Sequence, residues 1–176
     1  GNYGEVSLEI EPSALQGFRW ASRGALLGVH ATLAHSGIPS ATVERGASHV
    51  SSLLQSAGLK ADVSVVAVPS KGPGLHLTFI AEFERGLGVG QAAGQRGTRM
   101  ETVGAAAVEN LLVWLKSEAT LDAYLADQAL IMAAFSDSET HFTTNAITSR
   151  LMTMAWVIKE FVPIHVTILG TLGEPG

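Results

Sequence analysis

The spacing of apolar residues alternates along this chain between two periods, and this alternation limits the folds that it can adopt. Apolar side chains recur at every second position in residues 5–11, which predicts a half-buried strand that ends at Pro12. They recur at every third or fourth position from Ala41, which predicts a helix that stops near Gly58. A chain that mixes both periods in short segments is expected to form an α+β fold.

Further segments alternate in the same way. Strands are predicted at residues 25–34, 63–68, 75–83, 141–144 and 164–169, and helices at 101–116, 124–135 and 150–161. The second and third of these strands are joined by the Pro- and Gly-rich stretch 69–74, which indicates a hairpin.

A glycine-rich stretch follows the predicted hairpin. Five glycines lie between Gly86 and Gly97, which favours a flexible connection before the next helix. A phosphate-binding loop is the alternative, but the stretch lacks the Gly-x-x-x-x-Gly-Lys-Ser/Thr order and does not directly open a helix. We therefore interpret it as a linker.

Composition excludes several classes of protein. The hydrophobic content of 47% is enough for a core, and the absence of cysteine rules out disulfides, thiolate metal sites and thiol nucleophiles. The net charge of −5 is not that of a protein that grips a nucleic acid backbone over a broad basic face. No apolar run approaches the roughly 20 residues of a membrane span, and no signal peptide is recognisable. We expect a soluble, cytoplasmic protein that makes no membrane contact.

Polar residues that can carry chemistry are grouped on the predicted helix at 124–135. Tyr124, Asp127 and Gln128 are three and one positions apart, so Tyr124 can project from the same side of the helix as Asp127 or Gln128. The alternative is an ordinary amphipathic helix with these residues in water and Leu125, Ala129 and Met132 inward. No pair among the six histidines has the spacing of a metal site, and we predict none.

The order of these residues resembles that of a known family. Leu-Asp-Ala-Tyr-Leu-Ala-Asp-Gln at 121–128, followed by Thr-Ser-Arg-Leu-Met-Thr at 148–153, resembles the C-terminal signature of the RNA 3'-terminal phosphate cyclases. Further matching segments are Gly4-Glu5-Val6, Gly94–Gly97 with Glu101–Gly104, Phe142-Thr143 and Phe161–Pro163. The resemblance covers most of the chain, but only the C-terminal half of the family.

The resemblance implies a two-lobed α+β chain with a domain inserted into another. Residues 1–14 and 117–176 would form part of a cyclase-type core lobe built of a helix/sheet repeat. Residues 15–116 would form a small inserted α/β domain.

The resemblance also implies an activity. These enzymes use ATP and a divalent metal, Mg²⁺ or Mn²⁺, to adenylylate a histidine. They then pass AMP to an RNA 3'-phosphate, which closes to a 2',3'-cyclic phosphate. Tyr124, Asp127 and Gln128 would take a nucleotide-binding role, and the RNA 3' end would be a partner.

Arg150 stands where the family has its nucleophilic histidine. A neutral imidazole has a free lone pair near pH 7, whereas a guanidinium stays protonated and only donates hydrogen bonds. Arg150 is therefore not a nucleophile. It can bind a phosphate from the start of its helix, or it can pair with an acidic neighbour as a surface residue.

Three functions are consistent with these observations. The chain can be a cyclase-like protein without the standard cyclase reaction, or one part of an enzyme whose N-terminal half lies on another polypeptide. It can also be a non-catalytic RNA-processing or ribosome-assembly module that acts by binding or oligomerisation. Exposed sheet edges and apolar surface favour a homo-oligomer in each case.

Overall fold

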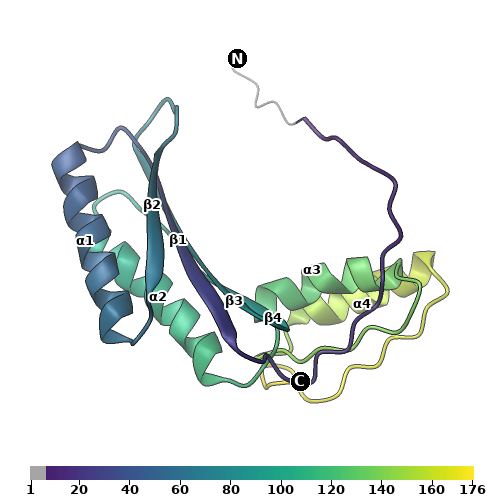
Figure 1. Ribbon diagram of the computed structural model, residues 1–176. Helices are drawn as coiled ribbons and strands as arrows, with labels where there is room; N and C mark the ends of the chain where they lie inside the picture. Colours follow the sequence, from purple (N-terminus) through teal and green to yellow (C-terminus); the bar gives the residue numbers. More distant parts are fainter. Residues whose placement is uncertain (1–6) are drawn as a thin grey trace.

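The computed structural model describes residues 7–176 and has an α+β fold (Figure 1). Its elements are, in order, β1 (Leu26–Ser36), α1 (Ser40–Ser56), β2 (Ala61–Ala67), β3 (Gly74–Phe83), β4 (Gly86–Ala93), α2 (Met100–Lys116), α3 (Ala123–Ala134) and α4 (Ser149–Phe161). The predicted fold class is confirmed, and so are all four predicted helices. The helix α1 is followed by Gly58 at a φ of 74°, a backbone conformation that glycine adopts without strain.

The four strands form one mixed sheet in the order β2-β1-β3-β4. β1 pairs in parallel with β2 and antiparallel with β3, and β3 pairs antiparallel with β4. Both α1 and α2 pack on the same face of the sheet, over the buried row Val29, Ala31 and Leu33 of β1. This row and the apolar sides of the two helices make the main hydrophobic core of the molecule.

The predicted hairpin between residues 63–68 and 75–83 is wrong. β2 and β3 are not neighbours, because β1 lies between them. β1 is long and its core-facing residues are almost fully buried, so it takes the central position, and α1 carries the chain across to place β2 beside it in parallel. The stretch 69–74 therefore bridges over β1 instead of turning a hairpin.

The interpretation of residues 86–97 as a flexible linker is wrong for residues 86–93, and only residues 94–97 lie in a connection before α2. Residues Gly86–Ala93 form β4, whose Gly88 and Gly90 lie against α2. A Cβ added to Gly88 would lie 2.1 Å from the Trp114 ring, and one added to Gly90 would lie 2.4 Å from the carbonyl oxygen of Ala107. The glycines are thus needed for close helix-on-strand packing, for which a linear pattern of glycines gives no signal.

A second, smaller hydrophobic cluster lies between α3 and α4, which run side by side (Figure 1). Ala126 and Leu130 of α3 pack against Leu151, Ala155 and Ile158 of α4. The extended residues 162–168 lie against this pair through alternate apolar side chains. The boundary between residues 15–116 and the remainder as separate domains stays a prediction.

Three predicted strands are not formed as paired strands. Glu5 and Val6 lie outside the described residues, and residues 7–11 are extended and exposed rather than half-buried. Residues 164–169 are extended without a strand partner, and His141 and Thr144 form only isolated bridges. An alternating pattern forms a ladder only when a second strand lies alongside it. Within residues 7–176, no strand forms a ladder with any of these three segments.

None of the helices in the described part of the chain is both long and apolar enough to cross a bilayer.

Candidate functional site

The first turn of α3 is held by the carboxylate of Asp122. Its Oδ1 accepts hydrogen bonds from the backbone N–H groups of Tyr124 (2.7 Å) and Leu125 (3.0 Å), so Asp122 is the N-cap of the helix. Its Oδ2 accepts a third bond, of 2.7 Å, from the N–H of Val89 in β4. One buried side chain therefore ties the start of α3 to the edge of the sheet.

The first turn of α4 is capped in a similar way by Thr148. The hydroxyl of Thr148 accepts a hydrogen bond of 3.1 Å from the N–H of Leu151. Arg150 follows two positions after the cap, and no acidic residue lies in this turn. The backbone N–H groups of Ser149 and Arg150 have no hydrogen-bond partner within residues 7–176, which leaves donors at the positive end of the helix dipole.

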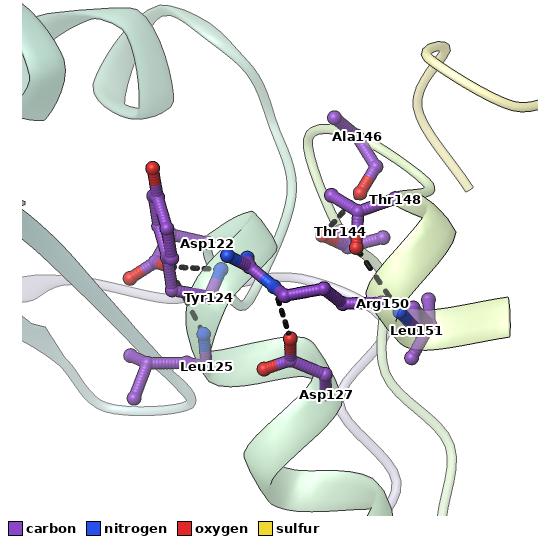
Figure 2. Close-up of polar contacts among 9 residues, drawn as sticks. All are labelled: Asp122, Tyr124, Leu125, Asp127, Thr144, Ala146, Thr148, Arg150 and Leu151. Carbon is purple, nitrogen blue, oxygen red and sulfur yellow. Dashed lines mark hydrogen bonds and ion pairs between the residues drawn. The ribbon is translucent and has the colours of Figure 1, made fainter. Parts of the chain in front are cut away.

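Three of the predicted residues meet where these two helices begin (Figure 2). The Nε of Arg150 donates to the Oδ2 of Asp127 at 2.8 Å, and the guanidinium carbon lies 4.5 Å from the centre of the Tyr124 ring. The Asp127 side chain is only 11% exposed, whereas that of Arg150 is 53% exposed. Both readings of Arg150 thus have support, since it pairs with an acidic neighbour and also presents a cation at a helix start.

This arrangement suits recognition of an anion. The two terminal nitrogens of the Arg150 guanidinium make no hydrogen bond within the described residues, and Figure 2 shows them directed toward Tyr124. Asp127 and the Tyr124 ring hold the guanidinium plane, which restricts the side chain before any ligand arrives. A guanidinium held in this way, with its two terminal nitrogens unbonded within the described residues, can bind phosphate oxygens.

Gln128 is not brought into this cluster. It lies along an apolar groove of about 280 Å³ on the neighbouring side of α3. The groove is lined by Phe18, Trp20, Leu87, Leu121, Leu125, Gln128, Ala129 and Met132. The alternative in which Leu125, Ala129 and Met132 face inward is only partly right, because Leu125 and Ala129 are half-buried while Met132 is 53% exposed.

Residues that support the site were missed from the sequence. Asp122 had a signal, because an aspartate directly before an apolar-periodic segment is an N-cap pattern. Thr120 had none, and Thr143 was noted only as part of the matching pair Phe142-Thr143. The N–H of Thr120 donates to the Thr143 hydroxyl at 3.0 Å, and the N–H of Thr143 donates to the Thr120 hydroxyl at 2.9 Å. These bonds join the segments that lead into α3 and α4 across 23 positions of sequence.

Electrostatics at the site are set by burial. Removal from water raises the pKa of the Asp122 carboxyl above its ordinary value, against three backbone hydrogen bonds that lower it, and the charge of Asp127 adds to the rise. Among residues 7–176, no three His, Asp or Glu side chains come together as a metal-ligand set. Asp127, the site's carboxylate beside the Arg150 fork, is already engaged by that arginine.

Comparison with known proteins identifies relatives that match most of this chain. The model of the family described as RNA 3'-terminal phosphate cyclase matches residues 1–168. An RNA 3'-terminal phosphate cyclase from Methanopyrus kandleri is 32% identical over 145 residues, covering 78% of this chain and 41% of the relative. Those from Archaeoglobus fulgidus and Methylococcus capsulatus are 32% and 33% identical, each over 90% of this chain and over 47% and 44% of the relative.

The chain spans somewhat less than half the length of these curated relatives. The match nevertheless runs through both hydrophobic clusters and through the segments that carry Tyr124, Asp127 and Arg150. The chain belongs to the RNA 3'-terminal phosphate cyclase family.

Proposed function

We propose that this chain binds the phosphate of an adenine nucleotide at the cluster of Tyr124, Asp127 and Arg150, and that it acts as a cyclase-like protein in RNA 3'-end processing. The observation that carries the proposal is the Arg150 guanidinium, held by Asp127 and Tyr124 at the start of α4. The family relationship supports ATP or AMP as the nucleotide.

The same residue argues against the family's covalent chemistry in this chain. Transfer of AMP to a side chain needs a nucleophilic lone pair, and a guanidinium bonded to a carboxylate offers none. Arg150 therefore binds the phosphate electrostatically where a histidine would be adenylylated. Standard cyclase activity is not expected of this chain by itself.

A divalent cation would arrive with the nucleotide. Mg²⁺ commonly keeps several waters and is held by substrate phosphates with one or two carboxylates. Asp127 already pairs with Arg150. We therefore propose that Mg²⁺ or Mn²⁺ is held mainly by the nucleotide phosphates and not by a set of protein ligands among the described residues.

An RNA 3' end and the remaining part of a cyclase are the proposed partners. The net charge of −5 does not provide broad phosphate binding, so contact with RNA would be local, at the 3'-phosphate. Relatives carry more than half of their length outside the region matched here. We propose that cyclisation would require that part, on this polypeptide or on another.

Calorimetric titration of the purified chain with AMP and with ATP, each with magnesium, tests nucleotide binding. Wild type should bind, and an Arg150→Ala variant should bind at least about tenfold more weakly, because a charge-assisted hydrogen bond contributes about 1.5–3 kcal/mol. Arg96→Ala is the matched control, since Arg96 is an exposed arginine in the loop after β4, at the opposite end of that strand from the residues that contact Thr120 and Asp122. Equal affinity in all three proteins would refute the assigned site.

Covalent labelling with ATP carrying a radioactive α-phosphate tests the chemistry. Wild type should take up no label, and Arg150→His should become adenylylated if the surrounding pocket retains the family geometry. Both should be assayed again with the part of the Methanopyrus kandleri relative that lies outside the match and a 3'-phosphorylated RNA. Release of AMP and a cyclic phosphate by the wild-type mixture would contradict the proposed loss of activity.

The alternative is a non-catalytic RNA-processing or ribosome-assembly module. Arg150 favours it as well, because loss of the nucleophile is compatible with pure binding. It becomes the better explanation if neither wild type nor Arg150→His binds a nucleotide while the chain still associates with RNA or protein.

A further inference from the structure

The loop of residues 144–147, which leads into α4, is bound on one side by the C-terminal segment 169–176, termed the strap. Four backbone hydrogen bonds of 2.6 to 3.0 Å join the two: from Thr144 to Gly176, from Gly176 to Thr144, from Ile147 to Glu174 and from Gly173 to Ile147. Figure 1 shows the C-terminus at the end of the helix pair nearest the sheet, where both helices begin. The strap is therefore fastened to the segment that delivers the chain into α4.

The side chain of Ile147 is covered by the strap. Ile147 is 2% exposed, although it belongs to neither of the two hydrophobic clusters. A Cβ added to Gly170 would lie 2.7 Å from its Cδ1 atom, and one added to Gly176 would lie 2.5 Å from the same atom. Gly170 also has a φ of 123°, which residues with a side chain rarely adopt. The backbone of the strap thus closes directly over Ile147.

The other side of the loop is fixed by the residues that precede α3. The N–H of Leu121 donates to the carbonyl oxygen of Thr143 at 2.9 Å, and Leu121 forms a bridge with Thr144. Directly after the loop, Thr148 caps α4 and Arg150 follows. The loop is therefore held between two stretches of chain, and each fastening reduces the number of conformations open to the start of α4.

We propose that the strap is a positioning element for the nucleotide site, and this inference rests on the function proposed above. It acts through the 144–147 loop, which sets where the start of α4 presents Arg150 to Asp127 and Tyr124. When the strap is displaced, the loop gains conformations and a smaller fraction of molecules has the site formed. The apparent affinity for a nucleotide falls in proportion to that fraction.

Two point variants in the whole chain release the strap. Gly170→Ala places a Cβ against Ile147, and Gly173→Pro removes the N–H that donates to the carbonyl oxygen of Ile147. Gly58→Ala is the matched control, because it strains a glycine with a φ of 74° that follows α1 and has nothing within 4 Å of its added Cβ. In calorimetry with AMP and magnesium, both strap variants should bind at least about threefold more weakly than wild type, and the control should be unchanged.

The Nε–H signal of Arg150 in NMR spectra reports the geometry of the site without a nucleotide. In wild type this proton should exchange slowly with water, because it is bonded to Asp127. In both strap variants it should exchange at least about threefold faster, since the bond is formed in fewer molecules. The signal is assigned by its loss in Arg150→Lys, whose side chain has no guanidinium.

The outcomes separate the strap from the site that it serves. A wild-type chain that binds no AMP would refute the proposed nucleotide site, and with it the role of the strap in binding. If wild type binds AMP but the strap variants bind no more weakly than Gly58→Ala does, the strap alone is overturned. An Arg150 exchange rate in both strap variants equal to that of wild type would overturn it as well.

Discussion

At the scale of single residues, Asp122 joins the start of α3 to β4. Asp122 is only 3% exposed, and its carboxylate accepts hydrogen bonds from three backbone N–H groups on two elements. A buried carboxylate that is fully hydrogen-bonded positions its neighbours strongly, because loss of the acceptor leaves several donors without partners. The position of Tyr124 relative to the sheet depends on this one side chain.

We predict that Asp122→Ala lowers the free energy of unfolding by about 2–3 kcal/mol, the combined effect of a lost N-cap and an unsatisfied N–H at Val89. Asp122→Asn should cost less, since its amide oxygen can still cap α3. Urea denaturation measures both. Asp62→Asn, which alters an exposed carboxylate on β2, should change stability by no more than about 0.5 kcal/mol.

The raised pKa of Asp122 predicts a pH dependence. Because burial makes the folded chain bind this proton more tightly than the unfolded chain does, the associated stability is present below the ordinary aspartate pKa of about 3.9. It is lost as pH rises through the folded pKa. The stability of wild type relative to Asp122→Asn should therefore fall as pH increases from about 4, then level off. Urea titrations of both proteins at several pH values measure this difference, and a rising difference would contradict the assignment.

Arg150 is expected to matter more for binding than for stability. Its ion pair with Asp127 is half-exposed on the arginine side, and such pairs contribute about 0–1 kcal/mol. Arg150→Ala should therefore lower the free energy of unfolding by about 1 kcal/mol or less. Arg150→Lys keeps the charge but not the planar fork, so AMP affinity should remain reduced. If Arg150→Ala lowered the free energy of unfolding by several kcal/mol, Arg150 would have a structural role instead.

At the scale of elements, the contact of β4 with α2 determines how closely the sheet and helix approach. Gly88 lies under Trp114 and Gly90 under the Ala107–Leu111 turn, so the backbone of the strand itself forms the packing surface. Arg23 lies over the same indole ring at 4.7 Å and donates to carbonyls at the end of α2, including that of Leu115 at 3.2 Å. A cation at a helix C-terminus interacts favourably with the helix dipole, so Arg23 stabilises the end of α2.

We predict that Gly90→Ala destabilises the chain by about 1–3 kcal/mol, because the new Cβ would overlap backbone atoms of α2 that cannot move alone. Gly72→Ala is the matched control. A Cβ at Gly72 meets nothing within 4 Å, so that variant should be close to neutral. Thermal unfolding of both variants measures the difference, and equal midpoints would show that α2 can shift away from β4.

At the scale of the whole molecule, the two hydrophobic clusters differ in extent. The sheet cluster includes fully buried Phe79, Leu77 and Trp114 between sheet and helices, whereas the α3–α4 cluster has a few buried residues and several exposed apolar ones. Trp156 is 62% exposed and Phe161 is 83% exposed. The α3–α4 pair is therefore stabilised by less buried apolar surface than the sheet and its helices are.

This difference predicts unequal opening. Amide hydrogen exchange should be slowest in β1 and β3 and clearly faster in α3 and α4, since local opening follows the amount of buried contact. Addition of AMP should slow exchange at the start of α4 if the proposed site is correct. Uniform protection across both clusters, with or without AMP, would contradict this description.

The sequence predicted much of the candidate site, although not its partners. Tyr124 and Asp127 were placed together because helical spacing is local, and Arg150 was singled out by its position in the signature. The Arg150–Asp127 bond crosses 23 positions, and the apolar groove along which Gln128 lies depends on what packs beside α3. Neither can be derived from spacing along one helix.

The sequence by itself determined the four helices and the α+β class, because helix hydrogen bonds and caps join residues a few positions apart. Only the tertiary structure decided which strands are neighbours, that residues Gly86–Ala93 are a strand, and that residues 7–11 and 164–168 pair with no strand within the described part of the chain. Strand pairing joins segments far apart in sequence, and it depends on which surfaces are buried when all elements pack together. A repeat of two residues specifies which side chains share a face, but not which strand lies alongside.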